Sequence, residues 1–187
     1  MLIAHADTVY NSSQEIIFED GIYRSGTPYC GIGADDRAGC AILYLMKDFG
    51  HSLLILDGEE HGSRGAEAIK NRHKDLYDEL NEHQYMIEFD RCNARDYKVY
   101  NLPVSQEFKN FIEEKTGYRE PNKSSSTDIV HLCSKICGVN LSVGYYNEHC
   151  YDDEYLVLEE WQHTLNIARN MLKGPQEKFP LLFSAVR

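Results

Sequence analysis

The sequence predicts an α/β fold, a three-layer α/β/α sandwich built on a mostly parallel, mixed sheet. Short apolar runs typical of buried strands alternate with longer segments in which apolar residues recur every three or four positions, as on one face of a helix. Strands that alternate with helices in this way form a parallel sheet with helices on both faces. The chain has 187 residues, of which 42% are hydrophobic, and this is enough for one globular core. We therefore expect a single domain over residues 1–187.

The strands are predicted from apolar runs that end at glycine or at charged residues. The pair Asp20-Gly21 separates two of these runs and is a signal for a hairpin turn. The run Ser52–Leu56 is interpreted as a buried strand, which Gly58 breaks. In chain order, the predicted strands are Leu2–Ala4, the hairpin arms Ile16–Phe18 and Gly21–Tyr23, Ser52–Leu56, Tyr85–Phe89 and Val139–Val143.

The helices are predicted from apolar periodicity and from the residues that stop it. Apolar residues from Ala38 to Phe49 recur at helical spacing, and Gly50 follows as a C-cap. The last helix is expected to end before Gly174-Pro175. The predicted helices cover 38–49, 63 to about 80, a short segment around 108–112 that stops at Gly117, 129–136 and 159–172.

Charge and hydropathy exclude several classes of protein. The chain carries 19 Lys+Arg against 30 Asp+Glu, a formal charge of −11, so binding to nucleic acid is not expected. No apolar run approaches the roughly 20 residues of a membrane span, and the N-terminus lacks the pattern of a signal peptide. The six cysteines include no C-x-x-C pair, which disfavours a zinc ribbon. We expect a cytoplasmic protein with free thiols that binds no membrane.

Histidines and carboxylates follow the predicted strands at the point where each strand ends. Ligands of open α/β sheets bind at the carboxyl ends of the strands, so these side chains are expected to gather at one edge. A further pair of aspartates lies in a glycine-rich loop just before a predicted helix. The residues concerned are His5 and Asp7, Asp35 and Asp36, Glu59 and Glu60, Asp90, and His149.

This set of residues has the composition of a zinc site. Neutral histidine and ionised carboxylate are ordinary zinc ligands, and two zinc ions would neutralise three carboxylates and a hydroxide. Without metal, the same carboxylates would repel one another. We interpret Glu59 as the base that takes a proton from water, and Asp7 as the residue that orients the His5 imidazole. The expected ligands to two Zn²⁺ ions, with Co²⁺ or Mn²⁺ as alternatives, are His5, Asp35, Glu60, Asp90 and His149.

Taken in order, these segments resemble the co-catalytic dinuclear zinc exopeptidases. That family includes bacterial leucyl and glutamyl aminopeptidases, peptidase T, carboxypeptidase G and aminoacylase. The resemblance covers about residues 2 to 172, and the hairpin at Asp20–Tyr23 matches the one before the family's double-aspartate loop. The matching stretches are His5–Val9, Gly33–Gly39, Asp57–Ala66, Phe89-Asp90 and Asn147–His149.

The resemblance implies a role for each residue. His5 would bind one zinc ion, Asp35 would bridge both, and Glu60 would bind one of them opposite the base Glu59. Asp90 and His149 would complete the two coordination spheres. A cis peptide bond is expected between Asp35 and Asp36. The chain looks like the catalytic domain alone, since no lid or dimerisation domain is inserted between Asp90 and His149.

The predicted function is hydrolysis of amide bonds. An aminopeptidase acting on short peptides is the leading interpretation, because the lid residues that hold a substrate carboxylate in other branches are missing. An N-acyl-amino-acid or small-amide deacylase, or a carboxypeptidase, is the first alternative, and a catalytically silent protein that retains its metals is the second. We favour a homo-oligomer, because a short sheet leaves an edge strand unpaired.

Three further segments have simpler interpretations. The acidic run Asp152–Glu154 is expected to be solvated. Cys133 and Cys137 lie one helical turn apart and are expected to face the core. The pair Tyr145-Tyr146 either lines the pocket or covers the end of the sheet.

Overall fold

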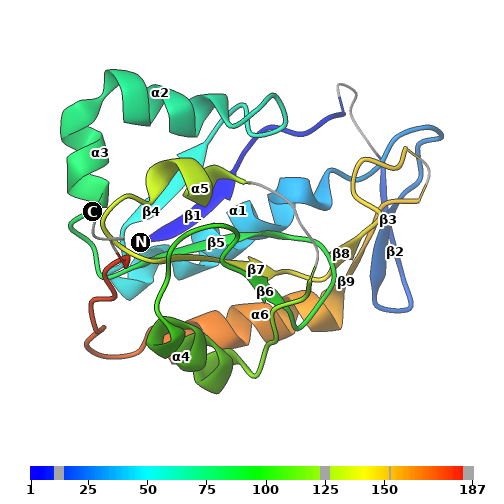
Figure 1. Cartoon of the computed structure of the whole chain (residues 1–187). Coiled ribbons are helices and arrows are strands. Elements are labelled where there is room, and N and C mark those ends of the chain that lie inside the picture. Colours follow the sequence, from blue (N-terminus) through cyan, green and yellow to red (C-terminus); the bar gives the residue numbers. More distant parts are fainter. Residues whose placement is uncertain (11–14, 123–126, 152, 183–187) are drawn as a thin grey trace.

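A mixed, mostly parallel sheet forms the centre of the protein (Figure 1). The structure is a computed structural model that describes residues 1–10, 15–122, 127–151 and 153–182. In spatial order the strands are β4, β1, β5, β7 and β6; the first four run parallel and β6 pairs antiparallel with β7. This confirms the predicted sheet. The strand bounds are Leu2–His5 for β1, Leu53–Leu56 for β4, Met86–Arg91 for β5, Tyr97–Lys98 for β6 and Gly138–Ser142 for β7.

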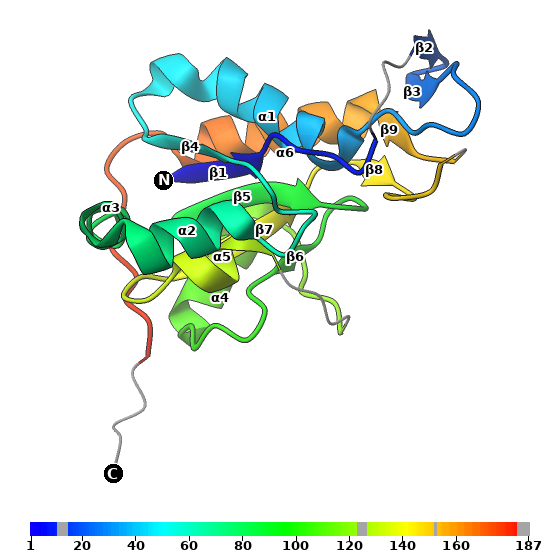
Figure 2. The same ribbon diagram turned by 90° about the horizontal axis from the view of Figure 1, so that it is seen from above.

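Helices cover both faces of this sheet, which gives the predicted three layers (Figure 2). Helices α1 and α6 lie together on one face, while α2, α3 and α5 lie on the other. Helix α4 packs beside α6. None of the helices in the described part of the chain has the length and apolar run needed to cross a membrane. The bounds are Ala34–Met46 for α1, Arg64–Arg72 for α2, Lys74–Leu80 for α3, Gln106–Thr116 for α4, Asp128–Leu132 for α5 and Leu158–Met171 for α6.

A second sheet, antiparallel and not predicted as such, lies at one end of the molecule. The predicted hairpin is confirmed, and both residues of its turn, Asp20 and Gly21, have positive φ, as this type of tight turn requires. The two other strands of this sheet have only two and three residues, too few for a periodic pattern. The strands are Ile16–Glu19 (β2), Ile22–Ser25 (β3), Tyr145–Tyr146 (β8) and Tyr155–Val157 (β9).

Two predicted helices differ from the structure. The segment from 63 to 80 is two helices, because His73 has non-helical φ and ψ of −125° and 63°. Helix α5 ends at Leu132 and not near residue 136, since the Asn81 side chain accepts hydrogen bonds from the backbone N–H groups of Ser134 and Lys135, which draws them away from helical pairing. Cys133 and Cys137 are buried as expected, although no helix joins them.

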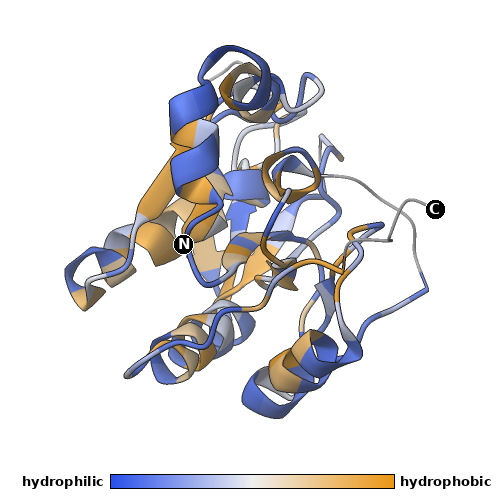
Figure 3. Ribbon diagram, turned by 60° about the vertical axis from the view of Figure 1, so that its left-hand side comes forward, coloured by the Kyte–Doolittle hydropathy of each residue, from blue (hydrophilic) through white to orange (hydrophobic). Residues whose placement is uncertain are grey.

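The apolar core lies between the sheet and its helices. In Figure 3 apolar residues concentrate on the central strands and on the helix faces turned toward them, whereas the outer helix faces are hydrophilic. All of β1 is buried. The strand predicted at Ser52–Leu56 is confirmed as β4, but its burial is only partial: β4 is the edge of the sheet, where Leu56 is buried and Ile55 is 54% exposed. The polar site described next lies at the carboxyl end of β1.

Candidate metal centre

The register of the sheet brings the first two predicted ligands together. Ile3 of β1 pairs with Glu88 of β5, so His5 and Asp90, each two residues further along parallel strands, lie side by side at the carboxyl ends. The register of β5 against β7 shifts between Glu88 and Arg91, an irregularity of the kind often found beside functional sites.

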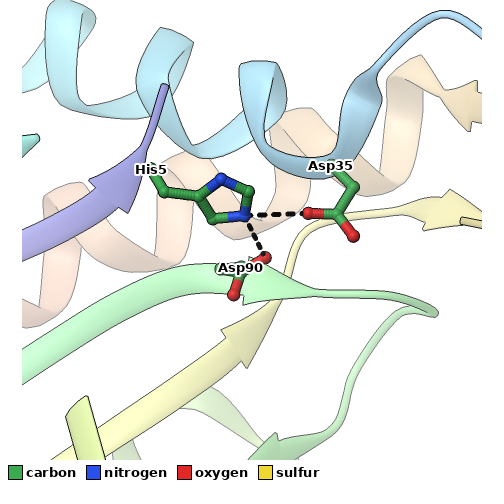
Figure 4. A group of neighbouring side chains, drawn as sticks. All are labelled: His5, Asp35 and Asp90. Atoms are coloured by element: carbon green, nitrogen blue, oxygen red, sulfur yellow. Dashed lines mark hydrogen bonds and ion pairs between the residues drawn. The ribbon is translucent and has the colours of Figure 1, made fainter. Parts of the chain in front are cut away.

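Two carboxylates approach the imidazole of His5 (Figure 4). Its Nε2 atom lies 3.0 Å from Oδ1 of Asp35 and 3.4 Å from Oδ1 of Asp90. Asp35 comes from the start of α1 and Asp90 from β5, and both point toward the ring. The His5 side chain is fully buried, and the two carboxylates are 11% and 7% exposed. We call His5, Asp35 and Asp90 the first ligand group.

A second ligand group consists of Asp35, Glu60 and His149. The Nε2 atom of His149 lies 2.9 Å from Oε2 of Glu60 and 3.3 Å from Oδ2 of Asp35. The side chain of Glu60 is 4% exposed, whereas that of His149 is 51% exposed. His149 was predicted to follow the strand Val139–Val143. It lies further along the chain, in the loop between β8 and β9.

Asp35 belongs to both groups and offers a different oxygen to each. Oδ1 faces His5 and Oδ2 faces His149. The structure thus brings all five predicted ligands together as two groups that share one carboxylate. The peptide bond between Asp35 and Asp36 is cis, as the family resemblance implied.

The residues fit a pair of divalent cations. Each group offers one imidazole nitrogen and two carboxylates, which is an ordinary donor set for zinc. The Nδ1 atom of His5 lies 3.0 Å from the backbone carbonyl oxygen of Asp7; when it carries the proton and donates to that oxygen, Nε2 is left free to bind a metal. Among the described residues, Oε1 of Glu60 is buried and has no hydrogen-bond partner. A bound cation would satisfy this oxygen.

Asp7 lies beside the His5 ring, as its predicted role in orienting the imidazole requires, and it has a second set of contacts. Its backbone carbonyl contacts the His5 ring, while its carboxylate, 3.3 Å from Nδ1, is mainly occupied elsewhere. The carboxylate accepts hydrogen bonds of 2.8, 3.1 and 3.2 Å from the backbone N–H groups of Gly58, Glu59 and Glu60. Asp7 therefore fixes the loop that carries both glutamates.

Burial and neighbouring charge shift the pKa values of the site. Burial lowers the pKa of His5, but hydrogen bonds to Asp35 and Asp90 outweigh it and the net shift is upward. Burial and the charge of Asp35 raise the pKa of Asp90 to about 7. Burial and the charge of Asp90 raise the pKa of Glu59 to about 8. Crowded carboxylates thus hold protons that bound cations would displace.

Hydrogen bonds from three residues hold Asp90 in place, and of these residues the sequence indicated only Tyr145. The hydroxyl of Thr127 donates to its Oδ2 atom at 2.8 Å, and the hydroxyl of Tyr145 donates to Oδ1 at 3.2 Å. The Asn140 side chain exchanges hydrogen bonds with the Asp90 backbone N–H and C=O. Tyr145 is therefore a contact of the site, and its neighbour Tyr146 donates to Glu160.

The acidic run before β9 is partly mispredicted. Glu154 is buried, and its carboxylate binds the loop that carries Asp35, so the expectation that it is solvated is wrong. Asp153 is exposed as expected, and Asp152 lies outside the described residues. The sequence held one signal: Glu154 and the buried Leu156 are two residues apart, the spacing of one strand face.

Comparison with known proteins gives structural matches. No family model matches the chain, and no curated protein matches its sequence. The crystal structure of aminopeptidase PepT from Bacillus cereus matches with a TM-score of 0.64 and 14% identity, over 91% of this chain and 79% of that one. A tripeptidase from Staphylococcus aureus matches with a TM-score of 0.65 and 14% identity, over 92% and 79%. Identity this low establishes the fold alone: the chain has the α/β fold of these two peptidases.

Proposed function

We propose that this protein is a hydrolase that cleaves peptide bonds with two bound zinc ions. The observation that carries the proposal is the pair of ligand groups that share Asp35 and lie at the carboxyl ends of the parallel strands of the sheet. When bound, the two ions would acidify a water molecule and polarise the scissile carbonyl. His5, Asp35 and Asp90 would hold one ion, and Asp35, Glu60 and His149 the other.

The chain itself would supply the proton transfers. Glu59 is the base in this proposal: it takes a proton from the attacking water and gives it to the leaving amine as the carbon–nitrogen bond breaks. The negative charges of Asp90 and Asp35 contribute to the raised pKa of the Glu59 carboxylate, which supports a position for Glu59 near both ligand groups. The hydrogen bonds from the backbone of Glu59 and Glu60 to Asp7 hold the backbone of the loop that carries the base and its neighbouring ligand.

The substrate class we propose is a short peptide with a free amino terminus. The structures that share this fold are described as an aminopeptidase and a tripeptidase, and their names support this choice. An N-acyl-amino-acid deacylase or a carboxypeptidase would use the same chemistry on a different substrate. A silent metal-binding protein would hold the ions without turnover, and the presence of Glu59 argues against it.

A substrate panel tests the proposal. Zinc-loaded protein is assayed with aminoacyl-anilides, tripeptides and N-acetyl amino acids, with Glu59→Gln as the inactive control. Turnover of the anilides and tripeptides supports an aminopeptidase. Turnover of only the N-acetyl compounds identifies a deacylase, and no turnover beyond that of Glu59→Gln contradicts an enzyme of this kind.

We also propose a homo-oligomer. Strand β4 forms an edge of the central sheet, and its Ile55 side chain is half exposed, so a neighbouring copy could cover it. The segment around Phe179 does not cover the site, because the Phe179 N–H binds the carbonyl of Gln84, just before β5 begins and so at the opposite end of the sheet. Light scattering at working concentration tests the assembly, and a monomer contradicts it.

A further inference from the structure

The Glu154 side chain contacts the backbone of residues 33–35, which lie 119–121 positions earlier in the sequence. One carboxylate oxygen, Oε2, accepts a hydrogen bond of 2.7 Å from the backbone N–H of Gly33. The other, Oε1, accepts from Ala34 at 2.9 Å and from Asp35 at 3.4 Å. Glu154 is only 3% exposed, so these bonds are shielded from water.

The three N–H groups need an acceptor from outside their own segment. Helix α1 begins at Ala34, its N-cap Gly33 has a left-handed φ of 60°, and no side chain within the helix caps it. Asp35 and Asp36 have non-helical backbone angles, so the first turn is irregular. Consecutive backbone N–H groups beside a left-handed residue form a concave site for an anion, which Glu154 occupies.

The same residue connects two segments that carry ligands. Glu154 closes the loop between β8 and β9, and His149 lies within that loop. Inside the loop, the N–H of Cys150 binds the carbonyl of Asn147, and the N–H of Glu154 binds the carbonyl of Cys150. These hydrogen bonds link the neighbours of His149 to Glu154, and Glu154 in turn binds residues 33–35, the segment that carries Asp35.

We propose that Glu154 is a positioning residue for the second ligand group, Asp35, Glu60 and His149. This inference rests on the proposed function. His149 is half exposed, so packing alone does not fix its side chain. Glu60 is held through its backbone N–H, which donates to Asp7. Glu154 therefore completes the support of this group by tying its remaining two ligands together.

Close packing around Glu154 makes the position specific. A Cβ atom at Gly31 would lie 2.2 Å from Oε2 of Glu154 and 2.3 Å from the hydroxyl of Tyr10. Only glycine leaves room for the carboxylate to reach the loop at this point. Glutamine has nearly the same size but offers one acceptor oxygen in place of two, and its NH₂ group would face backbone donors.

The test is a zinc titration of the metal-free protein by calorimetry. The wild type is expected to bind two ions, and Glu154→Gln to bind one of them roughly 10–100-fold more weakly, as for other residues that orient metal ligands. The other ion should be weakened less, because Asp35 is the one ligand it takes from the segments that Glu154 holds, whereas a general loss of structure would weaken both ions equally. Asp153→Asn is the matched control, because it removes one charge from an exposed neighbour in the same loop.

The outcomes separate this inference from the proposed function. Two wild-type-like binding steps in a folded Glu154→Gln protein, or equal weakening of both, would overturn the positioning role and leave the proposed function standing. A wild-type protein that binds no zinc would contradict the function itself. If circular dichroism shows that Glu154→Gln has lost its fold, Glu154→Asp is tested instead, because aspartate keeps the charge on a shorter side chain. Selective weakening of one ion in Glu154→Asp supports the positioning role, and unchanged binding of both ions overturns it.

Discussion

The carboxylate of Asp7 accepts a hydrogen bond of 3.1 Å from the backbone N–H of Glu59. Its two oxygens also bind the N–H groups of Gly58 and Glu60, so one side chain fixes a whole turn. The turn supplies the proposed base and one proposed ligand. Asp7 thus acts on the site in two ways: it holds the loop that carries Glu59 and Glu60, and it contacts the imidazole of His5.

Replacing Asp7 with alanine should lower kcat by roughly 10–100-fold, because residues that orient catalytic groups have effects of this size. The loop keeps its sequence but loses three acceptor contacts. Steady-state kinetics measures the effect, and Asp57→Asn, an exposed position beside the same turn, is the control. Wild-type kcat in Asp7→Ala would show that the hydrogen bonds do not matter for catalysis.

Glu59→Gln and Glu60→Gln should fail in different ways, although the residues are adjacent. Glu59→Gln is expected to keep both ions and lose 10²–10⁴-fold in kcat, the usual effect of losing a general base. Glu60→Gln is expected to weaken one ion, because Glu60 belongs to the second ligand group, where its Oε2 atom lies 2.9 Å from Nε2 of His149. Metal content and kcat are measured for each variant. If Glu59→Gln is the variant that loses metal, the assigned roles are reversed.

The metal-free protein should lose stability as the pH rises from about 5 to 8. In the folded state Glu59 and Asp90 have pKa values of about 8 and about 7, raised from ordinary values of 4.5 and 3.8. The folded protein therefore holds more protons than the unfolded chain in this window, so the free energy of unfolding falls with pH. Thermal unfolding of chelator-treated protein at constant ionic strength measures it.

Zinc should remove this pH dependence, because the ions replace the protons. The increase in unfolding temperature on adding zinc is therefore expected to grow from pH 5 to pH 8. In metal-free Glu59→Gln, the unfolding temperature should fall less steeply with pH than in the metal-free wild type. A metal-free protein that becomes more stable over this range would contradict the assigned pKa shifts.

Gly39→Ala should destabilise the fold, although alanine normally favours a helix over glycine by about 1 kcal/mol. A Cβ atom at this position would lie 2.2 Å from the backbone carbonyl oxygen of Phe89 and 2.4 Å from Oδ2 of Asp36. Overpacking of this kind typically costs about 1–3 kcal/mol. Urea unfolding measures the change, and a higher midpoint for the alanine variant would disprove the close approach of α1 to β5.

Sequence reasoning predicted the residues whose position depends on the parallel sheet. His5 and Asp90 follow strands that are recognisable from their apolar runs, and parallel strands deliver their ends to one edge. Asp35 and Glu60 belong to motifs with local signals, a glycine-rich loop and a turn after a strand. The same logic predicted the layers, because helices must cover both faces of such a sheet.

Contacts between distant segments could not be predicted in the same way. Glu154 reaches residues 33–35 from an acidic run, and because most acidic residues are solvated, its two-residue spacing from Leu156 is too weak a signal to predict that contact. The hydroxyls of Thr127 and Tyr145 reach Asp90 only after the chain has folded. Helix α5 stops early because of the Asn81 side chain, a tertiary contact that overrides local periodicity.

The central claim is that the two groups sharing Asp35 bind two divalent ions. The most direct measurement is the zinc content of protein that has been stripped, reloaded and passed through a desalting column, compared with Asp35→Asn treated identically. The account predicts two ions per chain in the wild type and loss of both in the variant, because Asp35 alone belongs to both groups. Wild-type protein with background metal only, or Asp35→Asn that retains two ions, would contradict it.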